Sequence, residues 1–160
     1  MKKERDIPFK NYVILALVLI LTIVVVIYFF KWYSFRERSV LGISIMDDYL
    51  MSINYNELDD YLIENKNAYI YVSVLNDSNI RRFENRFKNI IVRDNLGSYL
   101  LYMDLTGDVN KLDKYGSSIN IPCILVFNDG VLLDVYDIKR DNFNVNKLEE
   151  YLEKEVVIYD

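Results

Sequence analysis

Residues 119–130 read Ile-Asn-Ile-Pro-Cys-Ile-Leu-Val-Phe-Asn-Asp-Gly. The apolar residues at 124–127 are bulky or β-branched and turn-forming residues follow them, which predicts a strand buried on both faces. The Asn-Asp-Gly that ends the stretch tolerates positive φ angles, so we expect the chain to reverse there into an antiparallel strand over residues 131–138. Pro122 stands at the first position of the strand, where the loss of its N–H is tolerated, and it favours an extended conformation at Ile121.

A longer pattern surrounds this hairpin. The run Lys114-Tyr115-Gly116, a short spacer and the stretch from Ile121 to Gly130 resemble the second half of a thioredoxin, in which the spacer is usually one residue shorter. A strand and helix over residues 69–94 and a closing helix over 145–155 extend the resemblance to residues 50–156. The resemblance implies an α/β fold, a thioredoxin-like three-layer sandwich with a mixed central sheet, and a cis peptide bond before Pro122.

The other elements are predicted from local patterns. Apolar residues recur every three or four positions between Ile80 and Ile91, which indicates an amphipathic helix, and Gly97 follows its end. Asn54 followed by Glu57 three residues later is typical of a capping box. In chain order we expect a strand over 50–53, a helix from Asn54, strands over 68–75 and 99–105 on either side of the amphipathic helix, a short helix over 109–115, the hairpin, and a last helix over 145–155.

One N-terminal transmembrane helix is predicted ahead of this fold. Tyr12 to Phe30 is a run of 19 residues without a charge, and at 1.5 Å per residue it would span about 28 Å, close to the hydrocarbon thickness of a bilayer. A cleavable signal peptide is the alternative, but the run is longer than a signal core and ends in aromatic residues rather than small ones. We therefore predict a tail at 1–11, a transmembrane helix at 12–30, an interfacial stalk at 31–49 and a domain at 50–160.

Basic residues around the span indicate its orientation. Four precede it and three follow it: Lys2, Lys3, Arg5 and Lys10, then Lys31, Arg36 and Arg38. A short basic tail before a single span favours a cytoplasmic tail and an extracytoplasmic domain. The abundance of Asn, Ile, Lys and Tyr, with only two Ala, suggests an AT-rich bacterial genome. The predicted location is the bacterial cell membrane, with a single pass.

Charge limits the partners that the domain can bind. Residues 1–38 carry seven basic and three acidic groups, a net charge of +4, whereas residues 39–160 carry 12 basic and 21 acidic groups, a net charge of −9. An acidic domain disfavours nucleic acid, which needs a basic patch. The local group of Arg81, Arg82, Arg86 and Lys88 is interpreted as the solvated face of its helix. The expected partners are the membrane, through Tyr12 to Phe30, and a protein or extended peptide.

The chemistry of redox-active thioredoxins requires two cysteines at the start of a helix, in a Cys-x-x-Cys arrangement. The resemblance places that motif at Asp77-Ser78-Asn79-Ile80, which contains no cysteine. Asp77 or Ser78 is predicted to cap the helix instead. The buried acid found in many thioredoxins would fall near Tyr71, so this feature is also missing.

Cys123 is the one cysteine in the chain and follows Pro122 directly. Its pattern favours a small buried side chain at the start of a strand over a reactive thiol. The chain has no His, and the adjacent acidic pairs point in different directions on a helix. We expect no metal and no cofactor, and the sequence favours a role without catalysis while leaving enzyme activity open.

Two functions from different classes remain. The first is a membrane-tethered, redox-inactive thioredoxin-like domain that serves as an interaction or accessory module on the extracytoplasmic face, similar to anchored thioredoxin-like proteins among bacterial export and bacteriocin accessory proteins. The second is a thiol-dependent oxidoreductase or monothiol chaperone using Cys123. The resemblance implies a partner groove between two loops, although the same polar residues would also serve only to cap the helix and keep the tip soluble. The groove residues are Asn76, Asp77, Ser78, Asn79, Asn120, Ile121 and Pro122.

Overall fold

The computed structural model of the chain describes residues 9–116 and 119–158, so most of the predicted basic tail at 1–11 lies outside the described residues. The chain divides into two compact units, Met1–Val40 and Leu41–Asp160. Met46 is fully buried in the core of the second unit, together with Leu50, so residues ahead of position 50 take part in the packing of the domain.

The first unit is dominated by a single helix, α1 (Phe9–Leu41). Its segment Phe9–Tyr33 has 25 residues, and an 18-residue window within it has a mean hydropathy of 3.3 and no buried residue. At 1.5 Å per residue this segment is about 38 Å long, enough to cross a bilayer. Length and composition of this kind are shared by membrane spans and by signal sequences. The helix also runs through residues 31–41, which the sequence assigned to a stalk.

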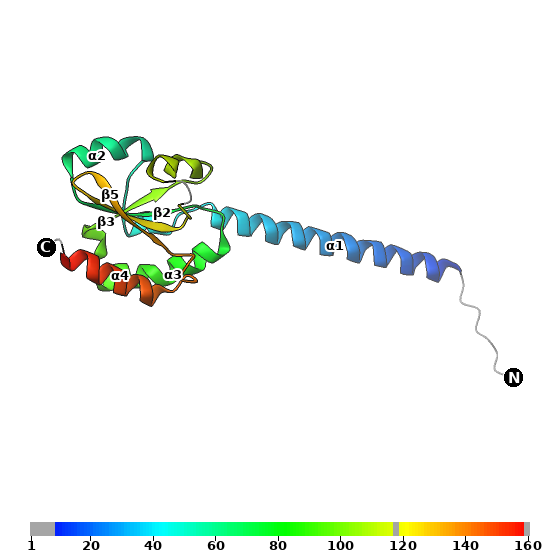
Figure 1. Cartoon of the computed structure of the whole chain (residues 1–160). Helices are drawn as coiled ribbons and strands as arrows, with labels where there is room; N and C mark the ends of the chain where they lie inside the picture. The colour runs from blue at the N-terminus through cyan, green and yellow to red at the C-terminus, as the bar shows by residue number, and fades with distance from the viewer. Residues whose placement is uncertain (1–8, 117–118, 159–160) are drawn as a thin grey trace. The chain divides into compact units, whose positions relative to one another are not determined.

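The second unit is built on a five-stranded mixed sheet with strand order β1-β3-β2-β4-β5 (Figure 1). β1, β2 and β3 run parallel to one another, whereas β4 is antiparallel to β2 and β5 is antiparallel to β4. The strands are β1 (Met51–Ser52), β2 (Ala68–Ser73), β3 (Leu100–Asp104), β4 (Cys123–Asn128) and β5 (Val131–Asp137). β2 lies in the centre, and all six of its residues are buried.

Helices cover both faces of this sheet, as Figure 1 shows. The α-helices are α2 (Leu58–Glu64), α3 (Ser78–Arg93) and α4 (Val145–Ile158), and the 3₁₀ helices are η1 (Met46–Asp48), η2 (Tyr55–Glu57), η3 (Leu96–Ser98) and η4 (Val109–Tyr115). α3 and α4 pack on one face, where Tyr69 and Tyr71 of β2 point. α2 and η4 pack on the other face, against Ile70 and Val72. The three-layer sandwich predicted from the sequence is confirmed.

Local signals place several of these elements correctly. The capping box forms, since Asn54 Oδ1 accepts a hydrogen bond from the Asn56 N–H at 3.0 Å and Glu57 Oε2 accepts one from the Asn54 N–H at 3.4 Å. In the hairpin, Asp129 and Gly130 have φ angles of 50° and 76°, as the mirror-image turn of a two-residue loop requires. The predicted hairpin is confirmed.

The prediction that Gly97 follows the end of the amphipathic helix is confirmed. α3 ends at Arg93, and the left-handed residue that follows it is Asn95, with a φ of 54°. Asn adopts this conformation more readily than other non-glycine residues because its short side chain bonds locally. Gly97 has a different role in η3, where an added Cβ would lie 2.8 Å from the Tyr49 carbonyl oxygen.

Candidate functional site

The predicted groove residues come from two loops that leave the sheet at the same end. Val72, near the end of β2, is the antiparallel partner of Cys123 at the start of β4. Ser73 is in parallel register with Asp104 at the end of β3. The loop that leads from β2 into α3 and the loop that leads into β4 therefore both emerge at this end of the sheet.

The first loop is held by side chains at the start of α3 and the end of β3. Asp77 Oδ1 accepts hydrogen bonds from the N–H groups of Asn79 at 2.8 Å and Ile80 at 3.2 Å, so Asp77 is the N-cap of the helix. Asn76 is left-handed, with a φ of 66°. The Thr106 hydroxyl accepts a hydrogen bond from the Leu75 N–H at 2.7 Å. The first-turn amides that would face a cysteine thiolate are thus occupied by the carboxylate of Asp77.

The second loop contains the cis peptide bond between Ile121 and Pro122, which the resemblance implied. Both of these side chains are buried, whereas Asn120 is exposed. Asn120 Nδ2 donates a hydrogen bond to Asp137 Oδ2 at 2.8 Å, which ties the loop to the end of β5. Among the described residues of the two loops, the exposed side chains are the polar, uncharged Asn76, Ser78, Asn79 and Asn120, whereas the carboxylate of Asp77 is half-buried and Asp104 is exposed at the end of β3.

The predicted burial of Cys123 is confirmed. Its side chain is 0% exposed and lies in the core between the sheet and α2. Burial, with a smaller contribution from the negative charge of Asp137, raises the pKa of the Cys123 thiol to about 12. The thiol is therefore protonated at neutral pH, and a protonated, shielded thiol is a poor nucleophile.

Glu84 is a buried carboxylate that the sequence reasoning missed. It lies on α3, is 4% exposed, and its Oε1 accepts hydrogen bonds from Ser73 Oγ at 2.7 Å and Tyr71 Oη at 3.1 Å. Burial raises the pKa of the Glu84 carboxyl, and the two donated hydrogen bonds act in the opposite direction. Glu84 stands four residues after Ile80 and three before Phe87, so the helical spacing places it on the apolar face and could have predicted its burial.

Glu84 and Cys123 lie on opposite faces of the sheet. Glu84 bonds to Tyr71 and Ser73, which point toward the α3 and α4 layer, whereas Cys123 packs in the α2 layer with Val72. A carboxylate separated from a thiol by the sheet cannot accept the proton of that thiol directly. The buried acid therefore does not supply the base that a thiol-dependent reaction at Cys123 would need.

Two basic residues of α3 bond to backbone carbonyls elsewhere in the domain. Arg81 donates to the backbone carbonyl of Ile43, and Arg86 Nη2 donates to the Phe143 carbonyl at 3.0 Å. Within residues 9–116 and 119–158, no three His, Cys, Asp or Glu side chains are grouped to hold a metal ion. A surface pocket of about 360 Å³ lies at the other end of the sheet, beside the hairpin turn, and is lined by Asp59, Leu62, Ile63, Lys66, Asp129 and Gly130.

Comparison with known proteins identifies the fold. No protein-family model matches the sequence, and no curated protein matches it. Among solved structures, the chain is similar to the thioredoxin of Fasciola hepatica, with a TM-score of 0.50 and 16% identity over 66% of this chain and 98% of that chain. Thioredoxin O2 of Arabidopsis thaliana in its oxidised state matches with a TM-score of 0.47 and 14% identity, over 69% of this chain and 97% of that chain. The domain has a thioredoxin-like fold, as predicted.

Proposed function

We propose that this chain is a membrane-tethered, redox-inactive thioredoxin-like module that binds a protein or an extended peptide on the extracytoplasmic face of a bacterial cell membrane. The observation that carries the proposal is the helix start at Asp77. Its carboxylate caps the amides of Asn79 and Ile80 at the place where the family resemblance puts two cysteines. The fold is kept, and the groups that perform the family's chemistry are replaced by a helix cap.

The state of the remaining thiol supports the same conclusion. Cys123 is fully buried, its pKa is raised, and the buried carboxylate of Glu84 lies across the sheet from it. A thiol-dependent oxidoreductase needs an accessible thiolate and a group that stabilises it. Neither requirement is met at Cys123, so binding is the better supported function.

Two observations support the proposed site and location. The rim formed by Asn76, Ser78, Asn79 and Asn120 presents hydrogen-bonding groups that suit an extended peptide backbone. The uncharged run of 19 residues from Tyr12 to Phe30, preceded by four basic residues, suits an anchor whose short tail stays in the cytoplasm.

Photocrosslinking in cells tests the proposal. A photoreactive residue is placed at position 78 or 120 in the groove, and in matched controls at position 149 or 154 on α4, all within the full chain. We expect a discrete crosslinked partner from the groove positions and a weak or diffuse signal from the α4 positions. Discrete bands from positions 149 and 154 alone would place the interaction on α4 and overturn the groove assignment.

A further inference from the structure

β5 forms an edge of the sheet that nothing else in the described part of the chain extends. It is seven residues long, and its one neighbour in the sheet is β4. The opposite edge is β1, which has only two residues. An edge strand presents backbone N–H and C=O groups that are free to pair with another extended chain. β5 is therefore the edge with enough length to accept a further strand.

The register identifies which backbone groups of β5 face outward. Ile138 donates its N–H to the Pro122 carbonyl at 3.3 Å, so this pair is hydrogen-bonded across the two strands. In an antiparallel pair, hydrogen-bonded and non-hydrogen-bonded positions alternate. Tyr136, opposite Ile124, is then the next bonded position, and the N–H and C=O groups of Val135 and Asp137 point away from β4.

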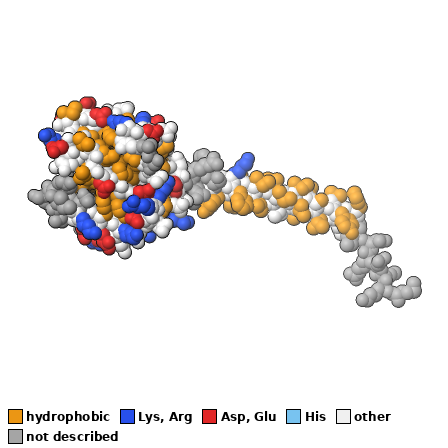
Figure 2. All heavy atoms as spheres, in the orientation of Figure 1, with side chains coloured by type: hydrophobic (Ala, Val, Ile, Leu, Met, Phe, Trp, Pro, Cys, Tyr) orange, Lys and Arg blue, Asp and Glu red, His pale blue; other side chains and the backbone are white. Residues whose placement is uncertain are grey.

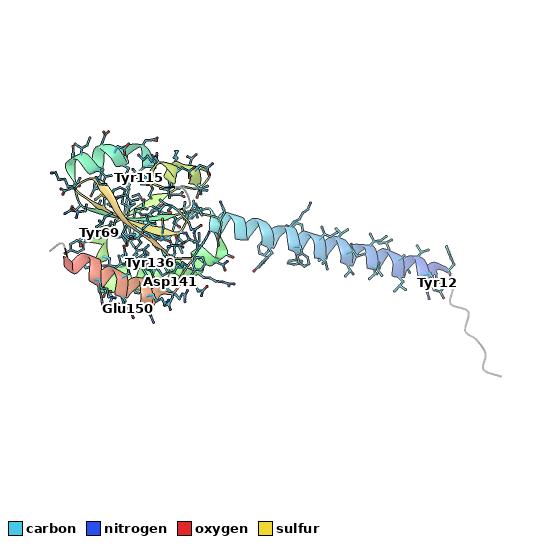
Figure 3. The ribbon with its side chains drawn as sticks, viewed as in Figure 1. Tyr12, Tyr69, Tyr115, Tyr136, Asp141 and Glu150 are labelled. Carbon is cyan, nitrogen blue, oxygen red and sulfur yellow. The ribbon has the colours of Figure 1, made fainter. Side chains whose placement is uncertain are left out.

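The side chains of β5 divide between a core-facing set and an exposed set. Tyr136 is buried on the side of the sheet that α4 covers, and its hydroxyl donates to Asp141 Oδ2 at 2.7 Å. Figure 3 shows Tyr136 and Asp141 on this side and Tyr115 of η4 on the α2 side. Val131 and Leu133 are 69% and 55% exposed. Figure 2 shows hydrophobic side chains across the middle of this face of the domain, where β5 lies in Figure 1.

A β-bulge limits the length of the regular edge, and two carboxylates give that edge a negative charge. The register shifts between Val126 and Phe127 of β4, so the regular part of β5 runs from Asp134 to Asp137. Asp134 Oδ2 accepts a hydrogen bond from the Tyr151 hydroxyl at 2.8 Å, and Asp137 accepts one from the Asn120 amide. Both of these donors are uncharged, so the edge keeps its negative charge.

These charges argue against a second copy of the chain as the occupant. Two β5 strands paired antiparallel would bring the aspartates of one copy close to those of the other, and like charges on neighbouring strands destabilise the pairing. The same carboxylates attract Lys and Arg. We propose that the outer edge of β5, from Asp134 to Asp137, binds an extended segment of a partner protein in which basic residues alternate with apolar ones, by addition of a strand to the sheet.

The proposal is tested with the full chain in non-ionic detergent and a fluorescent eight-residue peptide of alternating Val and Lys as the probe. We expect saturable binding in an anisotropy titration. The same peptide with N-methyl groups at alternate residues cannot pair along its backbone, and we expect it to bind at least about tenfold more weakly. Asp134 and Asp137 point to opposite faces of the strand, and the charges of an alternating peptide all lie on one face. A Val–Glu peptide of the same length would therefore meet one of the two aspartates and is expected to bind at least about fivefold more weakly.

A matched pair of variants assigns the binding to β5. Val135→Pro removes an N–H that faces away from β4, so the ladder between the strands is kept while the outer edge loses a donor. Val135→Thr keeps the N–H and the β-branched shape. We expect Val135→Pro to raise the dissociation constant at least about tenfold and Val135→Thr to change it less than about threefold. The N-methylated peptide also tests whether binding depends on backbone pairing, without any change to the protein.

Three results would overturn the proposal. The first is the absence of saturable binding by the Val–Lys peptide. The second is equal binding of the N-methylated peptide or of the Val–Glu peptide, since neither backbone pairing nor charge would then matter. The third is a stable dimer in sedimentation that Val135→Pro abolishes, because the edge would then be filled by a second copy. Since position 135 lies outside the groove loops, these results are independent of crosslinking at positions 78 and 120.

Discussion

The hydrogen bond from Ser73 to Glu84 offers a direct test of how the buried carboxylate is held. Ser73 is 0% exposed and its hydroxyl donates to Glu84 Oε1 at 2.7 Å, while Tyr71 donates to the same oxygen at 3.1 Å. Ser73→Ala removes the shorter bond and leaves one donor for a carboxyl group that water does not reach. A hydrogen bond contributes about 0.5–1.5 kcal/mol between neutral partners and about 1.5–3 kcal/mol when one partner is charged.

The effect of Ser73→Ala should therefore grow as Glu84 ionises. Burial raises the pKa of Glu84 in the folded domain above its unfolded value, so folding favours the protonated form. The contribution of Glu84 to stability is fully present below its unfolded pKa of about 4.3 and is lost as the pH rises through the folded pKa. Ser73→Ala raises the folded pKa further, because the lost bond favoured the charged form. We expect a loss of about 1 kcal/mol in mild acid and about 2–3 kcal/mol once Glu84 is ionised.

Pulse proteolysis of the full chain in urea, at a series of pH values, measures this difference in the free energy of unfolding. Ser52→Ala is the matched control, because the Ser52 hydroxyl donates to Asp47 Oδ1 at 2.6 Å on the exposed surface. We expect this control to lose less than about 0.5 kcal/mol at every pH. A loss for Ser73→Ala that is constant across the pH range, or equal to that of Ser52→Ala, would refute the reasoning.

The remaining predictions concern topology, the thiol and the helix cap. Protease added to intact cells or wall-stripped protoplasts should remove residues 40–160, and complete protection until lysis would reverse the proposed orientation. Cys123 should react slowly with a maleimide in the native protein and quickly in denaturant, because its side chain is 0% exposed. The purified protein should not reduce insulin. Fast labelling of the native protein would favour the thiol-dependent alternative. Asp77→Ala should lower the free energy of unfolding by about 0.5–2 kcal/mol, whereas Asp77→Asn, which keeps a capping oxygen, should stay close to the parent protein in the same urea assay.

The features that the sequence predicted correctly are set by neighbouring residues. The hairpin is determined by a buried run and a two-residue turn at Asp129 and Gly130, and the cap at Asp77 is determined by one side chain and the amides that follow it. Both patterns involve a few consecutive residues. The three-layer sandwich with its mixed central sheet followed from the resemblance rather than from any local pattern.

The features that the sequence missed depend on contacts between distant residues. Arg81 and Arg86 sit on the polar side of α3, and nothing in their spacing indicates that they donate to carbonyls 38 and 57 residues away. The burial of Glu84 was not predicted from the sequence, although its position between Ile80 and Phe87 places it on the buried face of α3. Charge alone favours exposure, and the two hydroxyl donors on β2 that make burial tolerable are visible only after folding.

The structure shows which contacts cysteines at the motif positions would replace. Cysteines at positions 77 and 80 would stand where the family motif falls, but Ile80 is 1% exposed and belongs to the core of the domain. A cysteine at position 80 would be buried, and one at position 77 would remove the N-cap of α3. The carboxylate of Glu84 is committed to Ser73 and Tyr71 by two hydrogen bonds. In the present structure the first turn of α3 is therefore built around the cap at Asp77 and the buried side chain of Ile80, and the buried carboxylate is bonded to two residues of β2.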